Sequence, residues 1–203
     1  YLNKGTDILD IADEVHAIFG FCDIRNFTDA TEIFQEEVMV FVNTIADIVH
    51  SIADEALGAA NKNVGDAFLI VWRVGPKDEM PVEGEKLDPG SARTNLADLA
   101  LHSLLCMHLE IGRAYQLKKF VDNPKMKERI GKNFRIRLGF GLHYGWAIEG
   151  ALGSHYKVDV TYLSPHVNMA ATLESETKKY GVPILISGEC YDLFSPYVQT
   201  YCR

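Results

Sequence analysis

The stretch "FGFCDIRNFTDAT" (residues 19–31) carries an apolar run into an aspartate, Asp23, before the sequence turns polar ahead of a helical pattern. The apolar residues that precede Asp23 predict a buried strand over residues 15–23. An aspartate at the end of such a strand can simply favour a turn. It can also be a metal ligand that the strand holds rigidly, and this stretch by itself leaves both interpretations open.

The composition indicates one globular domain over residues 1–203, because 47% hydrophobic and 24% charged residues are ordinary for a chain with a packed core. Residues 1–14 are expected to be a lead-in, and residues 75–94, rich in proline, glycine and acid, an exposed loop. The net charge of −8 argues against a nucleic-acid partner, which needs a basic face. A phosphate-bearing small molecule stays compatible with this charge, because a metal ion can supply positive charge locally.

The cysteines and the hydropathy indicate the cellular setting. The four cysteines show no C-x-x-C spacing, as expected of reduced thiols in the cytosol. No apolar run reaches the roughly 18 residues that span a bilayer, and no signal peptide is visible. The sequence starts at Tyr1 rather than at methionine. We therefore expect a cytoplasmic piece of a longer protein, in which any membrane attachment lies outside this chain.

Hydrophobic periodicity divides the chain into strands and helices. After the strand over 15–23, the expected elements are a helix over 31–54, a hairpin over 61–74, a helix over 95–119, a charged connector over 121–133, a strand over 134–142, a hairpin over 143–154, a strand over 156–163, a helix over 164–181, a strand over 182–187 and a short helix over 188–198. This order predicts an α+β fold in which helices pack on a mainly antiparallel sheet.

Two helices carry signals at their ends. Asp29 followed by Glu32 resembles a capping box at the start of the helix over 31–54. In the helix over 164–181, Ser164 is placed to cap the first turn, and Gly181 fits the end.

A second aspartate, Asp66, lies in the Val64-Gly65-Asp66 turn of the predicted hairpin. If this hairpin pairs beside the strand that ends at Asp23, the two carboxylates converge. Carboxylates at close range repel each other unless they share a proton or bind a divalent cation. Oxygen ligands of this kind suit Mg²⁺, and the helix N-terminus that follows Asp23 offers N–H groups to phosphate. Either aspartate alone is most simply explained by turn chemistry, whereas their joint placement favours a site.

Four motifs in order give the chain a resemblance to the class III nucleotidyl cyclases. "FGFCDIRNFTDATE" and "KNVGDAFLIVW" resemble the family's two metal motifs, and "RLGFGLHYGWAIEGALGS" is similar to its glycine-punctuated hairpin at the dimer interface. "DVTYLSPHVNMAATLES" resembles its Val-Asn-x-Ala helix. The resemblance covers residues from about 15 to 190, and it implies a ferredoxin-like, palm-like sheet with packed helices.

The resemblance also implies a metal and triphosphate site. Asp23 and Asp66 would bind two Mg²⁺ or Mn²⁺ ions, with the carbonyl of Ile24 as a further ligand. The amides around Phe27 and Thr28 would hold the triphosphate. Each active site in the family forms between two such domains, so a homodimer or a heterodimer with a second cyclase domain is expected.

The same resemblance implies the nucleotide. Lys62 matches a position that reads the base, and a lysine there suggests adenine, whereas guanylate cyclases carry a glutamate. Thr161 matches the second base-reading position, where the family commonly has an aspartate. A threonine there is compatible with adenine, because its hydroxyl can donate and accept a hydrogen bond. Asn168 matches the asparagine that orients the ribose. Without the motif, Lys62 would be interpreted as a solvated strand lysine and Asn168 as an exposed polar residue of a helix.

The sequence departs from the family at Thr172, where the family places an arginine that stabilises charge in the transition state. There is no arginine between Arg137 and Arg203. The family's closing hairpin, with its phosphate-binding lysine, would begin about where this chain stops. The expected activity is conversion of ATP to 3′,5′-cyclic AMP and pyrophosphate by two-metal phosphoryl transfer at a dimer interface.

Several alternatives stay open. The chain could be the metal-binding half of a heterodimeric cyclase, a non-catalytic regulatory or dimerisation module, or a guanylate cyclase. A diguanylate cyclase is disfavoured, because its Gly-Gly-Asp/Glu-Glu-Phe signature is absent from the sequence.

Overall fold

A computed structural model describes residues 12–76, 91–154 and 156–203. Most of the predicted lead-in (1–11) and of the predicted exposed loop (77–90) lies outside these residues. At their margins, residues 12–14 belong to the first strand and residues 75–76 to the third.

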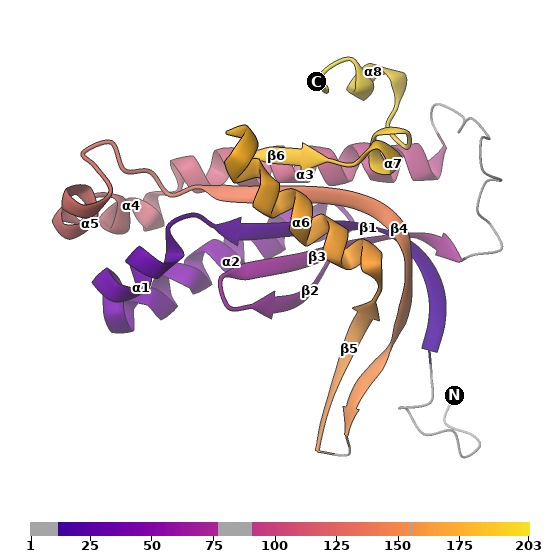
Figure 1. The fold of residues 1–203 in the computed structure, drawn as a ribbon, viewed down its shortest axis with the longest axis horizontal. Coiled ribbons are helices and arrows are strands. Elements are labelled where there is room, and N and C mark those ends of the chain that lie inside the picture. The colour runs from indigo at the N-terminus through magenta and orange to yellow at the C-terminus, as the bar shows by residue number, and fades with distance from the viewer. Residues whose placement is uncertain (1–11, 77–90, 155) are drawn as a thin grey trace.

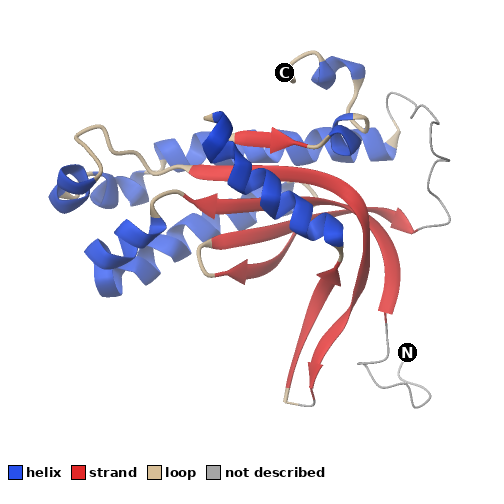
Figure 2. Ribbon diagram, viewed as in Figure 1, coloured by secondary structure: helices blue, strands red, loops and turns tan. Residues whose placement is uncertain are grey.

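The elements follow one another as β1 (Ala12–Ile24), α1 (Phe27–Phe34), the 3₁₀ turn η2 (Gln35–Glu37), α2 (Val38–Glu55), β2 (Ala59–Val64), β3 (Ala67–Pro76), α3 (Ala92–Arg113), the 3₁₀ turn η4 (Tyr115–Leu117), α4 (Lys118–Val121), α5 (Pro124–Arg129), β4 (Leu138–Ser154), β5 (Lys157–Leu163), α6 (Pro165–Tyr180), β6 (Ile184–Ile186), α7 (Gly188–Tyr191) and α8 (Pro196–Gln199). This is the predicted α+β class, with helices packed on a sheet (Figure 2).

The sheet has the strand order β2-β3-β1-β4-β5, and β6 pairs with the first part of β4. All pairings are antiparallel except that of β6 with β4. The far half of β4 and β5 form an arm that extends from the body, while α6 crosses one face of the sheet and α2 and α3 cover the other (Figure 1). The mainly antiparallel sheet is therefore confirmed.

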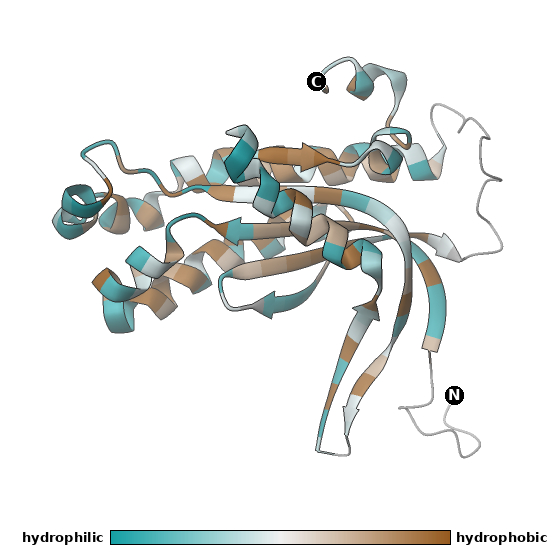
Figure 3. Cartoon of the chain, viewed as in Figure 1, coloured by the Kyte–Doolittle hydropathy of each residue, from teal (hydrophilic) through white to brown (hydrophobic). Residues whose placement is uncertain are grey.

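Strand β1 shows why the two faces differ, since successive side chains of a strand point to opposite sides. Ile18 and Cys22 are fully buried in the large core beneath α2 and α3. Ala17 and Phe19 belong to a smaller cluster that packs under α6. Four residues beyond Phe19, the same alternation places Asp23 on the α6 face. Figure 3 shows that the strands of the body are mostly hydrophobic, whereas the C-terminal end of α6 is hydrophilic.

Glycines on β4 let α6 approach the sheet closely. Gly139, Gly141 and Gly145 are all on the α6 face, and a Cβ added at any of them would lie closer than 3 Å to atoms that pack there. At Gly141 these atoms belong to the helix backbone, the carbonyl oxygen of Ala170 and the amide of Glu174. The first part of β4 therefore directs large residues towards the main core and glycines towards α6.

The first long helix is interrupted, which corrects the prediction of one helix over 31–54. Helix α1 begins at Phe27, and the chain breaks at Gln35, whose φ of 49° no α-helix contains. The predicted capping box is wrong as well, because Asn26 is the N-cap residue and it caps without its side chain. Asp29 and Glu32 instead form ion pairs with Arg129 of α5, each at 2.6 Å.

The boundaries of several other elements also differ from the predicted ones. Strand β4 begins at Leu138 and continues through the predicted hairpin over 143–154, so its turn to β5 falls after Ser154. The predicted connector contains the short helix α5, and the predicted helix over 95–119 ends at Arg113. The caps of α6 are as predicted, with Ser164 accepting from the amide of His166 and Gly181 in the left-handed conformation. In the part of the chain that is described, no helix combines the length and apolarity needed to cross a bilayer.

Replacing Gly141 by alanine tests the close approach of α6. The added methyl group must displace the helix backbone, so we expect Gly141→Ala to lower the free energy of unfolding by about 1–3 kcal/mol. Gly112→Ala in α3 is the matched control, because a Cβ there meets no atom within 4 Å and should be neutral or stabilising by up to ~1 kcal/mol. Urea unfolding measures both, and equal shifts of the two midpoints would contradict the role of Gly141.

Candidate functional site

The carboxylates of Asp23 and Asp66 meet at one end of the sheet. Asp23 is the second-last residue of β1 and lies opposite Ala67, the residue that follows Asp66 in the turn between β2 and β3. The pairing of β1 with β3 therefore brings Asp23 close to Asp66, where hydrogen bonding with Asp23 and its charge both act on the carboxyl group of Asp66. The convergence predicted from the strand and hairpin pattern is present.

The electrostatics of this pair favour a bound cation. Burial, together with the hydrogen bond and the charge of Asp23, raises the pKa of Asp66 to about 6. The ammonium of Lys178 on α6 partly offsets this charge, with its Nζ 3.5 Å from Oδ2 of Asp23. A carboxylate whose proton affinity is raised by burial and by a second carboxylate suits a divalent cation, since the cation removes the repulsion and prefers hard oxygen ligands. The residues present therefore fit Mg²⁺ or Mn²⁺.

The backbone beyond Asp23 leads into a helix N-terminus. Ile24 is buried, so the main core holds the backbone that carries its carbonyl group. Asn26 has a left-handed backbone, and Phe27 and Thr28 are the first two residues of α1. The side chain of Asn26 does not cap the helix, which leaves the amides of this turn available to an anion. The predicted triphosphate contact fits this geometry and stays a prediction.

The two predicted base-reading residues lie on β2 and β5, the strands at opposite ends of the strand order. These two strands approach each other, because Nδ2 of Asn61, next to Lys62, donates to the carbonyl oxygen of Val160, next to Thr161, at 3.2 Å. Lys62 is exposed and lines a pocket of about 620 Å³, together with Asp159. Thr161 is buried in the single chain.

Asn168 lies apart from the carboxylates. Asn168 and Thr172 are both exposed on α6, and the hydroxyl of Thr172 donates to the carbonyl oxygen of Asn168 at 2.9 Å. The face of α6 that packs on the sheet carries Ala170 and Glu174 instead. With a rise of 1.5 Å per residue, Asn168 is about 15 Å along the helix from Lys178, which contacts Asp23. The structure therefore does not bring Asn168 to the carboxylate pair of its own chain.

The sequence analysis missed three charged residues near the pair. Arg25 follows the predicted ligands directly, and its guanidinium Nη1 lies 2.8 Å from Oε1 of Glu174 on α6. Burial raises the pKa of Glu174, although the charge of Arg25 opposes this. Lys178, one turn further on, is the third. The spacing of Glu174 and Lys178 on one helix was a visible signal, but no local pattern showed that this helix reaches Asp23.

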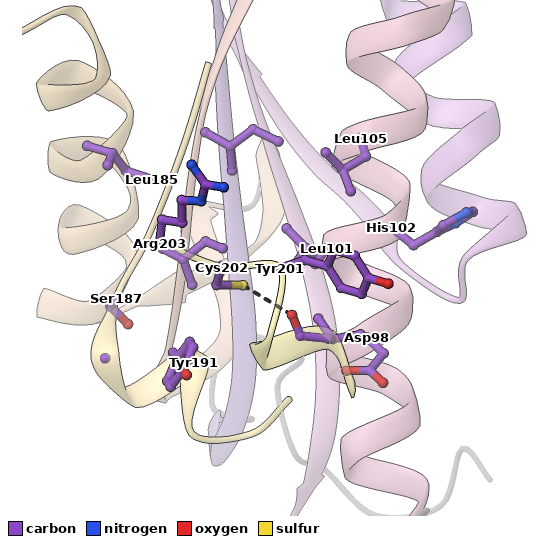
Figure 4. Close-up of a pocket in the computed structure, with 14 residues that line it drawn as sticks. Asp98, Leu101, His102, Leu105, Leu185, Ser187, Tyr191, Tyr201, Cys202 and Arg203 are labelled. Carbon is purple, nitrogen blue, oxygen red and sulfur yellow. Dashed lines mark hydrogen bonds between the residues drawn. The ribbon is translucent and has the colours of Figure 1, made fainter. Parts of the chain in front are cut away.

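A different pocket, of about 640 Å³, lies between α3 and β6 (Figure 4). Its lining is mainly apolar, with Leu101 and Leu105 facing Tyr201. Its carboxylate, Asp98, already accepts a hydrogen bond from the amide of Ser195 at 3.0 Å. None of the predicted site residues lines this pocket, so we place the candidate site at the carboxylate pair.

Comparison with known proteins identifies a family that matches nearly the whole chain. The sequence profile of the adenylate and guanylate cyclase catalytic domain matches residues 12–202. An adenylate cyclase of Anabaena cylindrica is 30% identical over 168 residues, which are 82% of this chain and 28% of that protein. The chain thus spans less than a third of the length of this curated relative.

Solved structures of both activities resemble the fold. The adenylyl cyclase CyaB from P. aeruginosa superposes with a TM-score of 0.69 at 21% identity, over 90% of this chain and 82% of that one. The guanylate cyclase domain of RhGC from Catenaria anguillulae, solved with GTP, gives 0.63 at 21% identity, over 89% and 83%. At these identities the likeness establishes the architecture and does not separate ATP from GTP.

Removing one carboxylate should stabilise the metal-free protein. Because ionised Asp66 is disfavoured in the folded state at neutral pH, Asp66→Asn should add about 1 kcal/mol after allowance for solvent screening. In chelator the melting temperature should then rise by about 2–4 °C. Added Mn²⁺ should raise the melting temperature of the wild type and leave that of Asp66→Asn unchanged.

Asp122→Asn is the control, because this exposed carboxylate pairs with Lys127 at 2.8 Å. It should gain no stability in chelator and should keep the response to Mn²⁺. An Asp66→Asn protein that melts below the wild type in chelator, or that still responds to Mn²⁺, would contradict the interpretation of the pair.

Proposed function

We propose that this chain, which belongs to the adenylate and guanylate cyclase catalytic domain family, converts ATP to 3′,5′-cyclic AMP and pyrophosphate. The observation that carries the proposal is the closeness of Asp23 and Asp66, two carboxylates brought together from distant segments, where burial and the charge of Asp23 raise the proton affinity of Asp66. A pair of this kind is suited to two Mg²⁺ or Mn²⁺ ions beneath a triphosphate.

Different residues of this chain would bind the metal ions and the phosphates during phosphoryl transfer. Asp23, Asp66 and the carbonyl of Ile24 would hold the metal ions. The bound ions would lower the pKa of the ribose 3′-hydroxyl and neutralise charge on the triphosphate. The amides of Phe27 and Thr28 would orient the phosphates for in-line attack at the α-phosphorus, because catalysis of this reaction is mainly positioning and charge neutralisation.

Adenine is the base that Lys62 and Thr161 would favour, because an ammonium and a hydroxyl can both bond to the edge of that base. The two residues lie on β2 and β5, which approach each other at the bond between Asn61 and Val160. The adenylate cyclase of Anabaena cylindrica among the relatives supports ATP. Guanylate cyclase stays the alternative specificity, since the fold is shared with guanylyl cyclases.

A second cyclase domain, from another copy of this chain or from a partner, would complete one site. Asn168 would orient the ribose, yet it lies about 15 Å along α6 from the helix turn that contacts Asp23 and faces away from the sheet. One ribose cannot contact both groups of the same chain. A surface for pairing is present on the arm of β4 and β5, where apolar side chains are exposed, namely Trp146, Leu152, Val158, Val160 and Leu163.

Thr172 supports a second candidate. A cyclase site needs a cation for the charge that develops on the phosphates, and Thr172 cannot supply it. The chain would then be the metal-binding half of a heterodimer whose partner domain supplies the arginine, or a regulatory module. The intact carboxylate pair favours the metal-binding half.

Loss of either carboxylate should abolish product formation. Asp23→Ala and Asp66→Ala each remove a metal ligand, so Mn²⁺-dependent formation of cyclic AMP from ATP should fall to background. The assay measures products from ATP and from GTP with the oligomeric state of the same sample, and Asp122→Ala, an exposed carboxylate, serves as control. Undiminished activity in either variant would end the assignment of these residues.

Thr172→Arg should raise cyclic AMP formation if the chain pairs with itself. A single charge-stabilising donor is commonly worth about 10²–10³ in rate, and Thr172 is exposed with room for a longer side chain. Thr172→Lys supplies a positive charge without the planar guanidinium of arginine, so it should give a smaller increase in rate. No response in either variant would favour the heterodimer or the regulatory module.

A further inference from the structure

Arg25 lies in the middle of the loop that joins the candidate metal ligands to the candidate phosphate-binding turn. Asp23 and Ile24 precede it, and Phe27 and Thr28 begin α1 two residues later. The amide of Arg25 donates to the carbonyl oxygen of Arg137 at 2.9 Å, which fixes one point of this loop against the segment that leads into β4. Its side chain fixes a second point.

The guanidinium of Arg25 is directed into α6 rather than towards the carboxylate pair. Nη1 lies 2.8 Å from Oε1 of Glu174, while Nη2 bonds to the hydroxyl of Thr177 and reaches the carbonyl oxygen of Glu174 at 3.5 Å. The side chains of Arg25 and Glu174 are only 16% and 5% exposed. Contacts with three groups in a site of low exposure hold the guanidinium far more firmly than an ion pair on the surface would.

Gly139 on β4 leaves the room that this contact needs. A Cβ at Gly139 would lie closer than 3 Å to the guanidinium of Arg25 and to the carboxylate of Glu174. Gly139 is also the β4 residue opposite Asp23. The loop and α6 therefore supply the two charged residues of this contact, Arg25 and Glu174, and β4 supplies the glycine that leaves space for them beside the candidate metal ligands.

We propose that Arg25, Glu174 and Gly139 are positioning residues for the loop that binds the metal and the triphosphate. Arg25 bonds to α6 and so holds the Ile24 carbonyl and the amides of Phe27 and Thr28 in place. The guanidinium is directed to Glu174 and Thr177 on α6, so the role proposed for Arg25 is to position the loop and not to bind the nucleotide. This proposal rests on the proposed function, because it assumes that the loop carries ligands of the metal and triphosphate site.

The test is binding of Mn²⁺ together with 3′-deoxy-ATP, an ATP analogue that lacks the attacking hydroxyl. Calorimetry on the whole 203-residue chain gives the dissociation constant, at a temperature well below the melting temperature of each variant. Arg25→Met, Glu174→Gln and Gly139→Ala should each weaken binding by about 10–100-fold, as is usual when support of metal ligands is lost. The matched controls, Glu176→Gln on the same helix and Gly112→Ala, should bind as the wild type does.

Two further variants keep the test decisive if a single variant folds poorly. Arg25→Met/Glu174→Met leaves no unpaired charge buried, so it should fold, and its binding should stay weak. Arg25→Lys keeps the charge but cannot bridge Glu174 and Thr177 together, so its dissociation constant should be intermediate. A folded double variant that binds as tightly as the wild type would overturn the proposal.

The outcome separates this inference from the proposed function. Wild-type protein that binds Mn²⁺ and 3′-deoxy-ATP but forms no cyclic AMP from ATP would refute the proposed activity and leave the positioning role standing. Wild-type protein that forms cyclic AMP while the Arg25 and Glu174 variants bind normally would refute the positioning role alone.

Discussion

Strand β1 is hydrogen-bonded along both edges, and this pairing determines where every group of the candidate site lies. Asp23 faces Ala67 on one side and Gly139 on the other, so its carboxylate has no freedom to move along the sheet. A slip by one residue would turn Asp23 into the core beneath α2 and α3. The alternation that buries Ile18 and Cys22 on that side is thus the same constraint that holds a carboxylate on the α6 face.

The contact between α6 and β4 links stability to the site. Glycines on β4 allow the helix backbone to approach, and at Gly139 the space is filled by the ion pair of Arg25 and Glu174. Removing only one member of a buried ion pair usually lowers the stability of the fold, because the other charge is left without a partner. The packing of this helix and the order of the loop after Asp23 therefore depend on the same few residues.

The carboxylate pair itself opposes folding when no cation is bound. Burial and mutual charge raise the pKa of Asp66 to about 6, and the ammonium of Lys178 reduces this repulsion without removing it. Groups that destabilise the folded chain and converge from separate segments are typical of sites that bind a ligand. The apolar pocket beside Tyr201 shows the contrasting case, because its carboxylate, Asp98, already accepts a hydrogen bond from the amide of Ser195.

The sequence by itself determined the class of fold, the order of most elements and the two aspartates, because periodicity, caps and turn residues act over short stretches of chain. It placed the capping box at Asp29 and extended one helix through Gln35, since no local signal revealed that Arg129 takes Asp29 and Glu32 as partners. Only the tertiary structure decided that Arg25 reaches Glu174, that Lys178 lies at Asp23, and that Asn168 lies far from both. The contacts of Arg25 with Glu174 and of Lys178 with Asp23 join residues about 150 positions apart. They depend on the register of β1 with β4 and on the packing of α6 against the glycines of β4, and no residue nearby in the sequence determines them.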